Sequence, residues 1–371
     1  MDHAGSDISD IKEQIDALTD PARRTLFRRA IGAGALASLG AVGLGLPNLV
    51  QAAQGGGAGN FPAHPNWKFV FVNHVTTNPF FVATQYGIQD ACALLGCTSQ
   101  WTGSQKSIAS EMVNAVNAAI AGNADGLAIA LVDPNAFNGP VERALQAGIP
   151  VFSYNADVDN KRLAYIGQDL FLAGKALGQR IASMVDSGEV VGFIATPGQL
   201  NIQPRLDGAK AAIKESGKDI TLREVATGPT VNEEVSRVES YYLGHRDVKA
   251  MFAVDAGSTM AVGKLMQKYK LHEKGVRAGG LDMLPGTLDA IQAGDMDFTI
   301  DQQPYLQGFY TVMEMFMFKL SGGLSGPANI NTGLKFVTQD NVQPYLETKT
   351  RFEGNSQQQQ LVERSGPITV E

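Results

Sequence analysis

Residues that carry catalysis and metal binding are scarce in this sequence. Two cysteines and five histidines occur among 371 residues, and the histidines are scattered, so no metal centre of Cys and His ligands is predicted. The Gly-x-Ser-x-Gly motif of a nucleophile elbow and the His-Glu-x-x-His motif of zinc proteases are both missing. We therefore expect neither an enzyme nor a protein that depends on a metal or a cofactor.

Charge and long apolar runs are also limited. Charged residues make up 18% of the chain and give a formal net charge of −7. Such a mildly acidic surface argues against nucleic acid, or an anionic membrane, as the main partner. The run Ala30–Leu46 is shorter than the roughly 20 apolar residues that a membrane-spanning helix needs, and Pro47 follows it.

The start of the chain is typical of an export signal. Two arginine pairs, Arg23-Arg24 and Arg28-Arg29, precede the apolar run, and the small residues around Ala52 suit cleavage. This pattern predicts a twin-arginine signal over residues 1–52, a glycine-rich linker over 53–66, and a protein that works in the periplasm. A general secretory signal and an uncleaved N-terminal anchor are the alternatives.

The two cysteines, Cys92 and Cys97, flank a predicted helix end at Gly96. In an oxidising compartment this spacing allows a local disulfide. Two small buried thiols near the start of a strand explain the same pattern equally well, and the sequence leaves both interpretations open.

From Trp67 onward, short β-branched and aromatic runs alternate with helical periods. This alternation predicts an α/β fold with parallel strands and right-handed crossovers, and it occurs twice along the chain. The predicted strands are Lys68–Asn73, Thr98–Trp101, Gly126–Ala130, Pro150–Tyr154, Val190–Ala195, Thr221–Val225, Ala250–Val254, Arg277–Leu281 and Met296–Ile300. Two similar halves predict a cleft between them, with the carboxyl ends of both sets of strands facing it.

Polar and aromatic groups follow several of these strand ends. Each polar residue alone is explained as a helix cap or a turn residue. Their occurrence after strands of both halves instead favours a shared site. These groups include Asn78, Phe80, Phe81, Asn155, Arg205, Asp255, Asp282 and Gln302.

Three short blocks, Asn78–Phe81, Gly280–Pro285 and Thr299–Pro304, resemble the ligand-contacting segments of periplasmic sugar-binding proteins of ABC importers, of the ribose and galactose type. The resemblance runs from about Trp67 to Val337 in matching order. It implies a type I periplasmic binding fold, in which two Rossmann-like lobes with parallel sheets are joined by three crossover strands. It also implies a monomeric receptor that closes around a monosaccharide or polyol and delivers it to an ABC permease in the inner membrane.

By the same resemblance, Phe80 and Phe81 are expected to pack against the C–H face of a sugar, and Asn78, Arg205, Asp282 and Gln302 to hydrogen-bond its hydroxyls. Two further positions of the ligand-binding set depart from the ribose-type pattern. Asp255 stands where relatives have Asn, and Asn155-Ala156 replaces an Asp-Arg pair, which puts ribose itself in doubt. Thr230-Val231 occupy the approximate place of an aromatic residue from the second lobe.

The resemblance also implies domain boundaries, with crossovers near Gln168, Gln302-Gln303 and Gly333. Lobe 1 is predicted over 67–167 plus 303–333, lobe 2 over 168–302 plus 334–350, and a C-terminal tail over 351–371.

Three other functions compete with transport. A chemosensory sugar receptor fits the same sequence features. A secreted sugar-processing enzyme would use Asp255 and Asp282 as a carboxylate pair. A sugar-responsive repressor would share the fold but would begin with a helix-turn-helix, which the export signal replaces here.

Overall fold

The computed structural model describes residues 62–324 and 326–346. The predicted export signal, the C-terminal tail, most of the linker and residues 347–350 of lobe 2 lie outside the described residues. Within the described ranges, no helix combines the length and the apolar character needed to cross a membrane.

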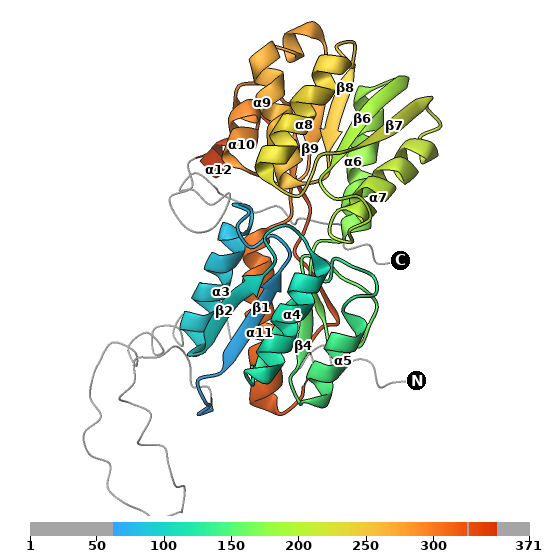
Figure 1. Ribbon diagram of the computed structural model, residues 1–371. Coiled ribbons are helices and arrows are strands. Elements are labelled where there is room, and N and C mark those ends of the chain that lie inside the picture. The colour runs from blue at the N-terminus through green and yellow to red at the C-terminus, as the bar shows by residue number, and fades with distance from the viewer. Residues whose placement is uncertain (1–61, 325, 347–371) are drawn as a thin grey trace, which may run out of the picture. The chain divides into compact units, whose positions relative to one another are not determined.

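A first parallel sheet forms from six strands in the order β11-β5-β4-β3-β1-β2. Figure 1 shows its strands β1, β2 and β4 in the lower half of the view, with α3, α4, α5 and α11 around them. Its interior strand β1, with the sequence KFVFVN, is buried at every position after Lys68 because helices cover both faces of the sheet. The strands are β1 Lys68–Asn73, β2 Thr98–Gly103, β3 Gly126–Ile129, β4 Val151–Tyr154, β5 Tyr165–Gly167 and β11 Asn329–Asn331. The helices that belong to it are α3 Phe81–Leu95, α4 Ala109–Ala121, α5 Asn138–Gln146 and α11 Pro304–Ser321.

A second parallel sheet has four strands in the order β7-β6-β8-β9. These strands are β6 Gly188–Ile194, β7 Ile220–Ala226, β8 Ala250–Ala253 and β9 Arg277–Gly280. Its helices are α6 Leu170–Met184, α7 Gln203–Glu215, α8 Val231–Gly244, α9 Ala256–Tyr269 and α10 Pro285–Gln292, with the 3₁₀ turn η1 His272–Lys274 after α9. The prediction of an α/β fold with two parallel sheets is therefore confirmed.

Two late strands complete the second half. Strand β10, Thr299–Asp301, pairs antiparallel with β12, Lys335–Val337, and follows a bridge between Gly279 of β9 and Phe298. This is the one antiparallel pair among the strands that the structure describes. The short helix α12, Gln343–Leu346, ends the described part of the chain.

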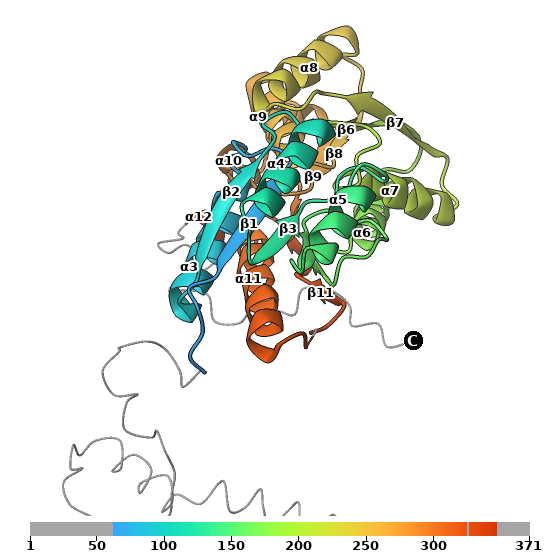
Figure 2. The ribbon, with the colours of Figure 1, turned by 60° about the horizontal axis from the view of Figure 1, so that its bottom comes forward.

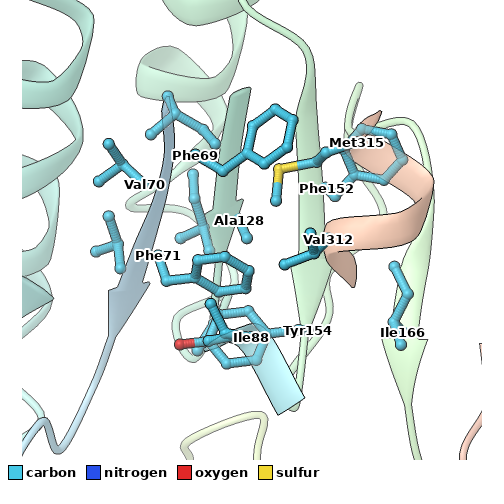
Figure 3. Packing of buried hydrophobic residues seen from close by; sticks show 14 of the residues in the cluster. Phe69, Val70, Phe71, Ile88, Ala128, Phe152, Tyr154, Ile166, Val312 and Met315 are labelled. Carbon is cyan, nitrogen blue, oxygen red and sulfur yellow. The ribbon is translucent and has the colours of Figure 1, made fainter. Parts of the chain in front are cut away.

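Different apolar clusters stabilise the two sheets, although the cluster of the first sheet also includes Ala256, Met260 and Leu284 of the second half. In the first, Val312 and Met315 of α11 lie close to Phe69, Phe152 and other apolar side chains of the sheet (Figure 3). In the second sheet, successive side chains of β6 point to opposite faces. Val191 and Phe193 therefore pack in one apolar cluster, and Val190 and Ile194 in another.

The chain changes sheets at three places. The first change lies between β5 of the first sheet and α6 of the second half. The second lies between β10, which is beside β9, and α11, which packs on α3. The third lies between β11, which pairs with β5, and β12, which pairs with β10. Figure 2 shows α11 near α3 and β1, although more than 200 residues separate them in sequence. We propose that the lobes divide after Gly167, Gln302 and Gly333, and this strand pairing supports the proposal.

The cysteines lie at the end of α3. Gly96 ends this helix with a left-handed φ of 67°, and the backbone N–H of Cys97 donates to the carbonyl of Cys92 at 3.1 Å. Both are free, buried thiols in the structure, which is the second of the two interpretations above. A disulfide between them stays a prediction for the oxidised protein.

Candidate ligand-binding site

One small cavity, of about 50 Å³, brings together side chains from both halves of the chain. All of the predicted ligand-binding residues line it: Asn78, Phe80, Phe81, Asn155, Arg205, Asp255, Asp282 and Gln302. Five other residues share the lining: His74, Val75, Asn201, Ile202 and Ala256. The structure thus places the predicted residues together, while their role in ligand binding stays a prediction.

Strand ends explain this convergence. Asn155 comes directly after β4, Asp255 lies just after β8 and Asp282 just after β9, while Gln302 follows β10 and Arg205 lies in the first turn of α7. The carboxyl ends of parallel strands lie at the same edge of a sheet, where ligands of α/β proteins bind.

Aromatic rings form one side of the cavity. Phe80 and Phe81 meet edge to face with ring centroids 4.9 Å apart, and Trp101 lies 5.8 Å from Phe81. Phe80 and Phe81 are 7% and 2% exposed, so the surrounding core fixes their orientation. Rings held in this way offer an apolar surface to the C–H groups of a small ligand.

A buried ion pair from the second half also lines the cavity. Arg205 Nη1 donates to Asp282 Oδ2 at 3.0 Å and to the carbonyl of Val254 at 2.9 Å, and Nη2 donates to Gln168 Oε1 at 3.2 Å. Asp282 Oδ1 accepts a hydrogen bond from Gln302 Nε2 at 2.6 Å. Arg205 is 1% exposed and Asp282 5%, and charges buried so deeply need this kind of pairing.

Close helix packing sets the position of Arg205. A Cβ atom on Gly174 of α6 would come within 2.0 Å of the Arg205 carbonyl oxygen, and one on Gly178 within 2.3 Å of the Ala209 carbonyl oxygen. Glycine at both positions lets α6 approach α7 directly, which places the guanidinium of Arg205 over the ends of β8 and β9.

Asp255 is engaged by the backbone on both of its oxygens. Oδ1 caps α9 by accepting from Ser258 N at 2.9 Å, and Oδ2 accepts from Ala195 N at 2.8 Å. The helix-cap interpretation therefore holds for this residue alongside its place in the cavity wall. Behind it, burial and the negative charge of Asp255 raise the pKa of Glu234 to about 10, so Glu234 is neutral at physiological pH.

Backbone strain coincides with the site. Asn155 has φ 63° and Asp282 φ 71°, in the left-handed region that non-glycine residues rarely adopt. Asn and Asp tolerate this conformation best, and such residues cluster at ligand sites because the surrounding structure holds them there.

Glutamines that the sequence did not single out connect the site to the crossovers. Gln307 Nε2 donates to Gln302 Oε1 at 2.8 Å, and Asn155 Nδ2 donates to Gln307 Oε1 at 3.3 Å. Gln168 Nε2 donates to the carbonyl of Gly333 at 3.0 Å, and Thr332 Oγ1 to that of Gln302 at 2.7 Å. The sequence predicts Gln168 only as a crossover position, and Gln307 only as part of a helix. The position of these glutamines close to the predicted crossovers is the sequence feature from which their role could have been predicted.

Three polar atoms on cavity-lining residues are buried and have no hydrogen-bond partner among the described residues: His74 Nδ1, Asn201 Oδ1 and Arg205 Nε. A buried polar atom left without a partner costs about 1–3 kcal/mol. All three atoms belong to residues that line one cavity. Within residues 62–324 and 326–346, no group of three or more His, Cys, Asp or Glu side chains is placed to hold a metal ion.

Among the described residues, no aromatic side chain of 168–302 lines the cavity. Ile202 and Ala256 supply the apolar contacts from that half instead. Thr230 and Val231, at the approximate place of the second-lobe aromatic residue, line a neighbouring cavity of about 220 Å³ that shares Val75 and Asn78 with the site.

Comparison with known proteins decides the family. The profile described as periplasmic binding protein domain matches residues 69–321. The chain belongs to the periplasmic binding protein family. It is 51% identical over 314 residues to the xylose/arabinose-binding protein XylF of Sulfolobus acidocaldarius, across 80% of this chain and 77% of that protein. It is 27% identical over 267 residues to the ribose import binding protein RbsB of Haemophilus influenzae, across 71% of this chain and 88% of that protein.

A solved structure shares the fold. The solute-binding protein of an ABC transporter from Burkholderia graminis, in complex with D-arabinose, superposes with a TM-score of 0.71 at 25% identity, covering 77% of this chain and 99% of that one. The predicted family and the type I fold are therefore confirmed. The relatives are solute-binding proteins, and the family works in the periplasm or outside the cell.

Proposed function

We propose that this protein binds a neutral aldopentose, xylose or arabinose, in the cavity and delivers it to an ABC permease. The observation that carries the proposal is the cavity itself, which unites aromatic rings from one lobe with a buried ion pair from the other and contains three unpaired polar atoms.

The lining chemistry favours a neutral, hydroxyl-rich ligand. Arg205 is neutralised by Asp282, so the lining offers no unpaired cation to a sugar acid or a sugar phosphate. Hydroxyl groups can both donate to and accept from its polar atoms.

The relatives narrow the sugar class. The relative at 51% identity is named for xylose and arabinose, and the solved relative at 25% identity holds D-arabinose. Asn155-Ala156 stands in place of the Asp-Arg pair of the ribose type, which supports a pentose other than ribose. Phe80 and Phe81 would cover one face of the ring, and Asn78, Asn155, Arg205, Asp282 and Gln302 would bind its hydroxyls.

Binding without catalysis accounts for both acidic residues. Asp282 is held by Arg205 and Gln302, and both oxygens of Asp255 accept backbone hydrogen bonds. Both carboxyl groups are thus fully engaged by partners within the protein, and binding explains them without a catalytic step.

Contacts between the lobes support capture by closure. Leu200 N donates to the carbonyl of Val132 at 2.9 Å, and the side chains of Ser107 and Gln199 join at 2.5 Å. We propose that the sugar stabilises this closed arrangement, which an inner-membrane permease distinguishes from the open one. The protein would act as a monomer exported by the twin-arginine route.

Calorimetry on ligand-free protein tests the proposal. The panel is D-xylose, L- and D-arabinose, D-ribose, D-glucose, D-galactose, xylitol and D-xylonate. We expect xylose or arabinose to bind most tightly and to raise the melting temperature. At a sugar concentration of 100 times Kd, binding should add about 2.7 kcal/mol to the free energy of unfolding. Xylonate should not bind. Tightest binding of a hexose or of xylonate would contradict the proposed ligand, and no heat or shift across the panel would contradict a sugar receptor.

A further inference from the structure

A histidine and an asparagine from opposite lobes meet at the cavity. His74 follows β1, and Asn201 precedes α7; Asn201 Nδ2 and His74 Nε2 lie 3.1 Å apart. Both residues line the cavity, and His74 is 5% exposed. Neither residue belongs to the set that the resemblance implies.

The chemistry of this pair follows from its geometry. Burial lowers the pKa of His74 to about 3, so its ring is neutral and carries one N–H and one lone pair. With Asn201 Nδ2 donating to Nε2, the ring hydrogen lies on Nδ1. Nδ1–H is then a donor and Asn201 Oδ1 an acceptor, and both are buried without a partner among the described residues. Reversing the amide exchanges the two roles and still leaves one donor and one acceptor.

The imidazole is also fixed in place. Its ring meets Phe81 edge to face at 5.4 Å and 89°, and the His74 carbonyl accepts from Ser107 N at 2.8 Å. A purely structural bridge between the lobes would use the single bond between His74 and Asn201 and would not leave two polar atoms unpaired beside a ligand cavity.

We propose that His74 and Asn201 form a clamp that binds the sugar from both lobes at once, with one group donating to and the other accepting from its hydroxyls. This inference rests on the proposed function and deepens it. The clamp selects the hydroxyl pattern on the side of the ring that faces it. It joins the lobes only when they close, so it also couples recognition to closure.

The test compares D-xylose and L-arabinose with their 2-, 3- and 4-deoxy analogues by calorimetry on full-length protein. In the wild type, one deoxy analogue of the bound sugar should lose most affinity. His74→Leu and Asn201→Ala should each weaken the parent sugar by about 10- to 100-fold. Both variants should lose much less affinity for that one analogue than for the parent sugar, because the hydroxyl that they would contact is missing.

Two further variants separate recognition from stability. His74→Gln keeps a donor and an acceptor and should retain part of the affinity and the same order among the analogues. His245→Gln alters an exposed histidine at the end of α8, outside the cavity lining, and should leave both unchanged. Circular dichroism and the melting temperature without sugar show whether each variant folds; Asn201 is only partly buried, so Asn201→Ala provides the test if His74→Leu does not fold.

The outcomes are distinguishable. Wild-type protein that binds neither sugar overturns the proposed function, and the clamp falls with it. Wild-type binding together with normal affinity of His74→Leu or Asn201→Ala for every analogue overturns the clamp alone. Weakening of all analogues by the same factor also overturns it, because a purely structural bridge would act in this way.

Discussion

The aromatic side and the ion-pair side of the cavity are built in different ways. Phe80 and Phe81 belong to the core of the first sheet, and neighbouring rings hold them. Arg205 and Asp282 lie at the ends of the second sheet and depend on one another and on polar side chains near the crossovers. The aromatic side therefore needs only packing, whereas the ion-pair side needs every partner in place.

This difference has a consequence for closure. Arg205 reaches the first crossover through Gln168, and Asp282 reaches the second through Gln302. A ligand that engages the ion pair is thereby connected to the segments that must bend, whereas one that touches only the rings is not. We expect substitutions on the ion-pair side to change ligand affinity more than those on the aromatic side.

Arg205→Ala should have the largest effect. It removes charge-assisted hydrogen bonds and leaves Asp282 buried without its cation, so we expect at least about 100-fold weaker sugar binding and about 3–5 kcal/mol lower stability. Calorimetry and urea unfolding measure the two losses.

A matched pair of variants sharpens this prediction. Arg205→Met combined with Asp282→Asn removes both charges and keeps a residue that tolerates the left-handed φ of position 282, so it should recover much of the stability but none of the binding. Arg223→Ala, which breaks the exposed pair with Glu189, should change neither. Normal sugar affinity in the double variant would show that the ion pair is structural only.

Gly174→Ala should have the next largest effect. The new Cβ would lie 2.0 Å from the Arg205 carbonyl oxygen, so α6 and α7 must separate and Arg205 must move. We expect a loss of about 1–3 kcal/mol in stability and roughly 10-fold weaker binding. Gly244→Ala is the control, because no atom outside its own helix and its chain neighbours lies within 4 Å of the added carbon. Unchanged affinity of Gly174→Ala would separate the helix contact from the site.

Phe80→Leu and Phe81→Leu test the aromatic side. Leucine keeps most of the apolar volume but loses the flat ring, and an aromatic contact of this kind is worth about 0.5–1.5 kcal/mol beyond its buried area. We therefore expect roughly 3- to 10-fold weaker binding, measured by calorimetry, with the order among the sugars kept. Phe316→Leu, in the same core but outside the cavity lining, controls for general loosening. A loss as large as that of Arg205→Ala would remove the contrast between the two sides.

The features that depend on local pattern could be predicted from the sequence. Alternating strands and helices follow from hydrophobic periodicity, and the strand ends of parallel sheets converge, so the sequence alone places Asp255, Asp282 and Gln302 together. Contacts between residues far apart in the chain could not be predicted in this way. Asn201 meets His74 across 127 positions, and Gln168 meets Arg205 only because α6 packs tightly on α7. From the sequence, His74 is most simply a structural histidine, since nothing in its neighbourhood along the chain indicates an unpaired ring nitrogen.

Glu234→Gln should have the smallest effect on binding and a distinct effect on stability. The pKa of Glu234 is raised from 4.5 to about 10, so between these values the folded state keeps a proton that the unfolded state releases. The free energy of unfolding of the wild type should therefore fall as pH rises through this window, by at most about 1.4 kcal/mol per pH unit. Glutamine stays neutral, so the free energy of unfolding of the variant should match that of the wild type near pH 5 and exceed it at pH 8. Sugar affinity should stay within about twofold, since Asp255 is unchanged.

Glu273→Gln, an exposed substitution, is the control and should follow the wild-type dependence of stability on pH. Urea unfolding at both pH values measures the difference; parallel profiles for Glu234→Gln and the wild type would mean that Glu234 is ionised in the folded protein, and that the wall behind Asp255 carries two negative charges.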